Sequence, residues 1–184
     1  EIKDALAYMR LVSSRDSDPS FERVVNLPPR GIGARTLEHI REIARAESLS
    51  MWQAARASLD RGMLSARASG AVGGFLELID RSAIEVEDRT LSVISECVLE
   101  KSGLMAHYQK DNSERAQGRV ENLRELVTAA DNFSPVEPDE ESLNVLALFL
   151  TDAALEAGEG RAEEWEDCVQ LMSLLAAKGL ECRL

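Results

Sequence analysis

Apolar residues recur at helical spacing along most of the chain. In the segment 34–47, Leu37, Ile40, Ile43 and Ala44 form one stripe, and charged side chains fill the opposite face. The segment 142–157 is apolar on nearly all sides, which predicts a helix at the centre of the core. Similar patterns predict helices at about 1–14, 18–25, 50–60, 65–87, 90–102, 104–110 and 114–132. The expected fold is an all-α, irregular multi-helix domain.

Prolines and glycines mark where these helices should begin and end. Asp18-Pro19 is typical of a helix start, Pro28-Pro29 stops the preceding helix, and Gly103 suits a left-handed residue at a helix end. Residues 132–142 are rich in acids and prolines, which predicts a surface connection. The apolar run 168–175 is compatible with either a short buried strand or the start of a helix.

Composition narrows the functional classes. The 184 residues carry 33 acidic and 21 basic side chains, giving a net charge of −12. This charge argues against nucleic-acid binding by bulk attraction, but a local contact made by backbone amides stays open. No apolar run of about 18 residues is present, so we expect no membrane segment. The three cysteines form neither a disulfide framework nor a zinc pattern, which favours a reducing cytosol.

The sequence offers little catalytic chemistry. His39 and His107 lack metal-ligand partners at suitable spacing, and no serine lies in a G-x-S-x-G motif. No G-x-x-x-x-G-K-[ST] loop is present for the phosphates of a nucleotide. We therefore expect no catalytic, cofactor or metal site in this chain. Because the chain also does not begin with methionine, we expect it to be a piece of a longer protein.

The segment Pro28-Pro29-Arg30-Gly31-Ile32-Gly33-Ala34-Arg35-Thr36 is the main candidate for a binding function. Its prolines give a rigid entry, and its glycines permit positive φ and close approach of another backbone. The amides at the helix start that follows carry partial positive charge, and Ile32 is expected to point inward. This predicts contacts to nucleic-acid phosphates without base reading. The amides of Gly31, Gly33 and Ala34 would point outward, and Arg30, Arg35 and the Thr36 hydroxyl would add phosphate contacts.

A plain connection between two helices is the alternative interpretation of this turn. In that case the two glycines only reverse the chain, and a short glycine pattern alone is compatible with both interpretations. The flanking prolines and arginines favour phosphate binding.

Several segments in order along the chain resemble the UvrD/Rep/PcrA group of superfamily 1 DNA helicases. They are Glu1-Ile2-Lys3-Asp4-Ala5-Leu6-Ala7-Tyr8, Phe21-Glu22-Arg23-Val24-Val25-Asn26, Pro29-Arg30-Gly31-Ile32-Gly33, Arg119-Val120-Glu121-Asn122-Leu123-Arg124-Glu125-Leu126, Phe149-Leu150-Thr151-Asp152-Ala153-Ala154-Leu155-Glu156, Val169-Gln170-Leu171-Met172 and Ala177-Lys178-Gly179-Leu180-Glu181. The resemblance covers essentially the whole chain.

This resemblance implies a place for the chain within a four-part motor. Such helicases have two RecA-like parts, 1A and 2A, which bind ATP and Mg²⁺ between them and carry helical insertions 1B and 2B. The chain would comprise a 2A stub at 1–12, the helical 2B subdomain at 13–166 and a second 2A stub at 167–184. The fragment itself would hold no cofactor, hydrolyse no ATP and unwind no DNA.

The resemblance also implies a function and partners. The 2B subdomain would contact the DNA duplex near a fork through helix–hairpin–helix-like elements that include Gly31-Ile32-Gly33, and its rotation would regulate unwinding. On this resemblance the candidate DNA-binding residues are Gly31, Ile32, Gly33 and Thr36, with Arg30 and Arg35 as helpers. The parent would be a bacterial, cytoplasmic, nucleoid-associated 3′–5′ helicase acting in DNA repair. Its 2B part would contact the 2A, 1A and 1B parts and DNA-repair proteins, and no membrane.

The last segment departs from the family pattern. Leu175 stands where the family usually has His, and Cys182 stands at a usual aromatic position. Either the segment is a degraded version of helicase motif V, or the end of this chain differs from that of the natural protein. The family's role for Lys178, Gly179 and Glu181 is therefore not carried over to this chain.

A second function class is an acidic helical protein-interaction module with no direct DNA contact. Salt-dependent binding to duplex DNA would distinguish the two hypotheses, because only the first one requires it.

Overall fold

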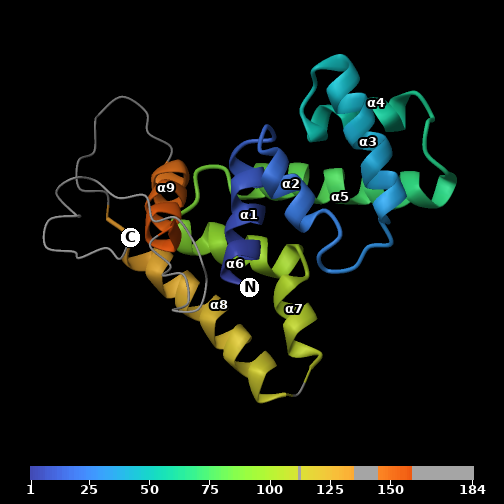
Figure 1. The fold of residues 1–184 in the computed structure, drawn as a ribbon. Helices are drawn as coiled ribbons and strands as arrows, with labels where there is room; N and C mark the ends of the chain where they lie inside the picture. The colour runs from blue at the N-terminus through green and yellow to red at the C-terminus, as the bar shows by residue number, and fades with distance from the viewer. Residues whose placement is uncertain (112, 135–144, 159–184) are drawn as a thin grey trace, which may run out of the picture.

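The computed structural model of the chain describes residues 1–111, 113–134 and 145–158, which form helices joined by turns (Figure 1). No β-strand occurs in these ranges, which confirms the prediction of an all-α fold. The predicted run 168–175 and most of the predicted connection 132–142 lie outside the described residues. The helices are α1 (Ile2–Ser13), α2 (Asp18–Val24), α3 (Ala34–Glu47), α4 (Met51–Asp60), α5 (Ala66–Glu85), α6 (Leu91–Lys101), α7 (Leu104–Gln109), α8 (Glu114–Asn132) and α9 (Val145–Gly158).

The helix ends follow local signals in the sequence. Pro19 lies in the first turn of α2, where its missing N–H removes no hydrogen bond. Ser50 and Gln53 form a reciprocal capping box at the start of α4. Gly103 separates α6 from α7 with φ +75°, the left-handed conformation expected for a glycine at this position.

Helix α1 occupies the centre of the fold. It packs against α2, α5, α6, α8 and α9, and Figure 1 shows it crossing the middle of the molecule. Most of its residues are buried as a result: Asp4, Ala5, Leu6, Ala7, Tyr8, Met9, Leu11 and Val12. The polar member of this set, Asp4, accepts a hydrogen bond from Arg23 Nε at 2.7 Å and one from the Tyr108 hydroxyl at 3.2 Å. The buried carboxylate is therefore paired.

The prediction that the apolar helix near 142–157 is central was wrong for its described residues. Helix α9 packs against α1 at the edge of the helical array, and it buries Leu146, Phe149 and Leu150. Val145 on the same helix stays 46% exposed. The central position belongs to α1 because neighbours surround that helix on several sides, which sequence hydrophobicity does not specify.

Three aromatic rings join α2, α4 and α5 in the core. The ring of Phe21 lies edge-on to that of Trp52 at 6.4 Å and to that of Phe75 at 5.5 Å between centroids. Such edge-to-face pairs add to the stabilisation from apolar burial. Together with the packing of α3 on α4, this cluster fixes the α3–α4 unit against the rest of the domain.

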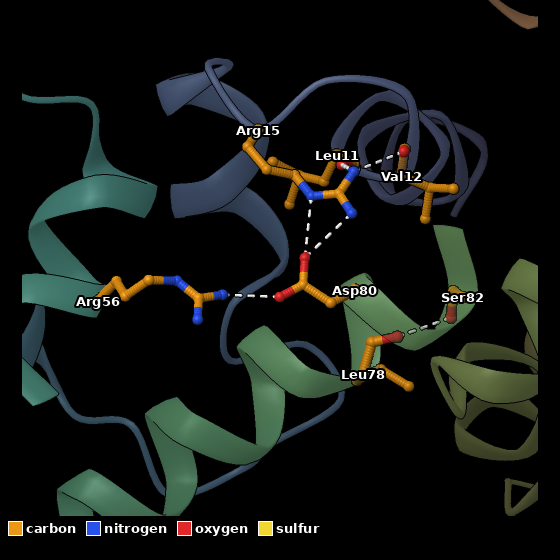
Figure 2. Close-up of polar contacts among 7 residues, drawn as sticks. All are labelled: Leu11, Val12, Arg15, Arg56, Leu78, Asp80 and Ser82. Carbon is orange, nitrogen blue, oxygen red and sulfur yellow. Dashed lines mark hydrogen bonds and ion pairs between the residues drawn. The ribbon is translucent and has the colours of Figure 1, made fainter. Parts of the chain in front are cut away.

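Two arginines share the carboxylate of Asp80, as Figure 2 shows. Asp80 of α5 accepts from Arg15 Nη2 at 3.1 Å through one oxygen and from Arg56 Nη2 at 2.7 Å through the other. Both guanidinium groups lie over the Trp52 ring, at 5.5 Å and 6.0 Å from its centroid. Arg15 also donates to the last carbonyls of α1. This arrangement ties the α1–α2 turn and α4 to α5.

Helices long and apolar enough to cross a bilayer are absent from the described residues.

The Tyr8 hydroxyl predicts a specific loss of stability at alkaline pH. It lies at hydrogen-bond distance from the carbonyls of Leu27 and Val24, and burial raises its pKa to about 12 against the positive charge of Arg30. Because folding raises the pKa of Tyr8, the neutral hydroxyl contributes fully to the free energy of unfolding below pH 10. This contribution is lost as the pH rises to about 12. The raised pKa corresponds to a loss of unfolding free energy of roughly 3 kcal/mol at most when Tyr8 ionises.

Urea unfolding of wild type and Tyr8→Phe between pH 9 and pH 12 measures this contribution. At pH 9 we expect Tyr8→Phe to be about 1 kcal/mol less stable than wild type, because a hydrogen bond is lost. Near pH 12 we expect Tyr8→Phe to be more stable than wild type, because it has no hydroxyl to ionise. A difference in unfolding free energy that does not change with pH would contradict this account.

Candidate nucleic-acid interface

Residues 28–36 comprise the turn before α3 and the first residues of that helix, and they include two distinct glycine positions. Gly31 has φ +82°, a conformation that strains any residue with a Cβ atom. Gly33 is the N-cap of α3, with φ −84° and ψ 168°. Other amino acids adopt this extended backbone conformation without strain. Only Gly31 therefore needs to be glycine for conformational reasons. Between them Ile32 is 1% exposed and packs in the core, as the sequence predicted.

Alternate amides of this turn bond to a single side chain. Asn26 Oδ1 accepts from the N–H of Arg30 at 2.8 Å and from the N–H of Ile32 at 3.2 Å. Within the described part of the chain, the N–H groups of Gly31, Gly33 and Ala34 have no hydrogen-bond acceptor, and all three residues are exposed. The turn thus presents unpaired amides at the start of α3, where the helix dipole is positive.

Two exposed arginines belong to the helix starts that meet at this turn. Arg35 is exposed in the first turn of α3. Arg67 of α5 is exposed and close to the turn: a Cβ atom placed on Gly31 would lie 3.8 Å from Arg67 Nη2. Neither arginine has an ion-pair partner among the residues that the structure describes.

The starts of α3 and α5 are therefore neighbours, and both lie at the right of the view in Figure 1. Sequence reasoning did not find Arg67, because it is distant from the glycine turn along the chain and belongs to a separate predicted helix. Thr36 lies one residue after Arg35 and is partly exposed, with its N–H donated to the Gly33 carbonyl at 3.0 Å.

Arg30 is placed differently from the other candidate residues. Its guanidinium turns into the protein and donates to main-chain carbonyls, including that of Ser102 at 2.8 Å. The structure thus gathers Gly31, Gly33, Arg35 and Arg67 at one exposed place, and it directs the side chains of Arg30 and Ile32 inward. Arg35 and Arg67 bring two positive charges to this place, although the chain as a whole carries −12.

The described residues contain no group of three His, Cys, Asp or Glu side chains that could hold a metal ion. The sequence also lacks a phosphate-binding loop of the G-x-x-x-x-G-K-[ST] type. The unpaired amides at the start of α3 make the exposed turn suited to hold an anion.

Comparison with known proteins identifies the family. The UvrD-like helicase C-terminal domain matches residues 1–61 and 74–183 of the chain. This chain belongs to the UvrD-like helicase family. The match includes Gly31-Ile32-Gly33 and omits the segment that contains Arg67.

Individual relatives agree with this assignment of the UvrD-like chain. It is 51% identical over 181 residues to "DNA helicase II" of Escherichia coli (strain K12), a match that covers 98% of this chain and 25% of that protein. It is 44% identical over 182 residues to "DNA helicase II" of Haemophilus influenzae, with the same coverage. It is 37% identical over 187 residues to "ATP-dependent DNA helicase PcrA" of Bacillus subtilis (strain 168), again with 98% and 25% covered. The chain thus spans about a quarter of the length of these relatives.

Proposed function

We propose that this chain is the duplex-binding and regulatory 2B subdomain of an ATP-dependent 3′–5′ DNA helicase that acts in DNA repair. Residues 13–166 form the subdomain in this proposal, and residues 1–12 and 167–184 are stubs of the adjoining 2A part. Family membership and the names of the relatives, which include DNA helicase II and ATP-dependent DNA helicase PcrA, support it. ATP and Mg²⁺ would bind to other parts of the parent protein.

The observation that carries the DNA-binding role is the meeting of two helix starts at one exposed turn. Gly31, Gly33 and Ala34 offer unpaired N–H groups, and positive charge comes from the guanidinium group of Arg67 near Gly31 and from the exposed Arg35 in the first turn of α3. A phosphate oxygen at the start of α3 would accept from these amides in the positive field of the helix dipole. The arginines would bind the same phosphate or its neighbours.

This arrangement holds the sugar–phosphate backbone and carries no sequence information. Backbone contacts of this kind position a protein on the duplex, and their affinity depends strongly on salt. The net charge of −12 opposes binding elsewhere on the chain. We therefore expect a dissociation constant of roughly 10⁻⁴ to 10⁻⁶ M at physiological salt.

Titration of a fluorescent DNA duplex with the 184-residue chain at several salt concentrations tests this proposal. Each phosphate contact contributes about −0.9 to the slope of log K against log salt. Arg35→Ala and Arg67→Ala should each weaken binding and make the slope shallower by about one contact. Arg81→Ala is the matched control, because Arg81 lies on α5 far from its start and pairs with Glu77.

Absence of salt-dependent binding by the wild-type chain would overturn the proposal. It would favour the alternative, an acidic helical module that binds a protein partner. Equal slopes for wild type and both arginine variants would remove this turn from the DNA interface.

The remaining partners follow from the same proposal. The parent would be a bacterial protein of the cytoplasm, associated with the nucleoid. The 2B subdomain would contact the 2A, 1A and 1B parts of the same helicase and DNA-repair proteins.

A further inference from the structure

The Arg30 side chain is held at the ends of two helices. Its Nη1 donates to the carbonyl of Val24, the last residue of α2, at 3.2 Å. Its Nη2 donates to the carbonyl of Ser102, the C-cap residue that follows α6, at 2.8 Å. Carbonyls at helix C-termini carry partial negative charge, so the guanidinium is stabilised by both helices.

Two aromatic rings complete the surroundings of this guanidinium. Its central carbon lies 5.7 Å from the centroid of Tyr8 in α1 and 5.4 Å from that of Phe75 in α5. Both rings are buried, with Tyr8 1% and Phe75 0% exposed. Nη1 also donates to the carbonyl of Pro28, at 3.1 Å. The donors that could bind a phosphate are thus directed to the protein's own carbonyls.

The junction between α6 and α7 also contacts the same turn through an apolar side chain. A Cβ atom placed on Gly103 would lie 3.8 Å from Cγ of Pro28, so the proline ring packs close to the Gly103 backbone. Ser102 and Gly103 therefore hold the turn at two points, one polar and one apolar.

We propose that Arg30 positions the duplex-binding turn and does not itself contact DNA. Through Arg30 the α6–α7 junction and the central helix α1 set where the amides of Gly31, Gly33 and Ala34 lie. This proposal rests on the proposed function, and it assigns the control of that site to residues buried behind it.

Lysine substitution separates a positioning arginine from a contacting one. A lysine can replace an arginine at a phosphate, because a point charge suffices there. It cannot reproduce a planar fork that serves three carbonyls and stacks on aromatic rings. We expect Arg30→Lys to weaken duplex binding at least about tenfold, and Arg35→Lys and Arg67→Lys to remain within about twofold of wild type.

Amide hydrogen exchange supplies a readout that does not depend on DNA. The N–H of Ile32 donates to Asn26 Oδ1, and its protection reports whether the turn keeps its shape. Exchange at Ile32 should be at least about tenfold faster in Arg30→Lys and unchanged in Arg35→Lys. Wild-type affinity and wild-type exchange in Arg30→Lys would overturn the proposal.

The exchange measurement also separates this proposal from the proposed function. If the wild-type chain binds no duplex, the DNA-binding function fails, and faster exchange in Arg30→Lys still shows that Arg30 holds the turn. If the wild type binds and Arg30→Lys binds equally well, only the positioning role fails.

A second pair of variants covers the case in which Arg30→Lys does not fold. Phe75→Leu removes a ring that stacks on the guanidinium, at a residue that is 0% exposed and cannot contact DNA. Phe21→Leu makes the same change in the same aromatic cluster, at a ring that does not stack on Arg30. We expect Phe75→Leu to lower duplex affinity about threefold and Phe21→Leu to leave it unchanged. Equal affinities and equal Ile32 exchange in the two variants would overturn the proposal.

Discussion

Replacement of Gly33 by aspartate is expected to weaken duplex binding strongly without loss of stability. Gly33 is the N-cap of α3, its φ is −84°, and a Cβ atom placed there meets no atom within 4 Å. Aspartate is a better N-cap than glycine by a few tenths of a kcal/mol, so the fold should become slightly more stable. Its carboxylate would occupy the site proposed for the DNA phosphate and would repel that phosphate. We therefore expect the affinity for duplex DNA to fall at least about tenfold, or ~1.4 kcal/mol.

Gly33→Asn is the matched control for this variant. It has nearly the same shape and also caps the helix, but it carries no charge. We expect its affinity to lie between those of wild type and Gly33→Asp, and the gap between the two variants measures the electrostatic part. Fluorescence titration gives the affinities, and thermal unfolding gives the stabilities. Tight binding by a well-folded Gly33→Asp would contradict a phosphate site at the start of α3.

Truncation of Phe21 to alanine is expected to cause the largest loss of stability. The ring is 0% exposed, and it contacts the rings of Trp52 and Phe75 edge-on. Removal of a buried phenylalanine ring costs about 3–5 kcal/mol, because the lost burial is joined by a cavity that the neighbours cannot fill. The total free energy of unfolding of a protein domain is only about 5–15 kcal/mol, so a considerable part of the stability would be lost.

Urea unfolding of Phe21→Ala and of Ile84→Ala measures this difference. Ile84 is 73% exposed, and its truncation should change the unfolding free energy by no more than about 0.5 kcal/mol. A loss below about 1 kcal/mol for Phe21→Ala would show that the three rings do not form the core described here.

Most helix positions could be predicted from the sequence because their signals are local. The stripe of Leu37, Ile40 and Ile43 indicated α3, and Asp18-Pro19 indicated the start of α2. Periodicity reports that a helix has an apolar face, but not how many neighbours cover it. For this reason the sequence suggested the apolar helix near 142–157 as the centre, whereas α1 is the helix that others surround.

The candidate interface was only partly predictable. The buried Ile32 between two exposed glycines follows from the turn and helix-start pattern. Arg67 reaches the turn only because α5 begins beside α3, and the inward direction of Arg30 depends on the ends of α2 and α6. These are contacts between segments distant in the sequence, so no local pattern contains them.

Local sequence patterns were sufficient to predict the all-α class, the family resemblance and the turn at Gly31-Ile32-Gly33, because helix periodicity, capping and glycine conformation depend on neighbouring residues. Tertiary structure alone decided that α1 is the central helix, that Arg67 joins the turn and that Arg30 binds carbonyls within the protein. The reason is that close packing sets the direction and partners of a long charged side chain, and packing is a property of all the helices together.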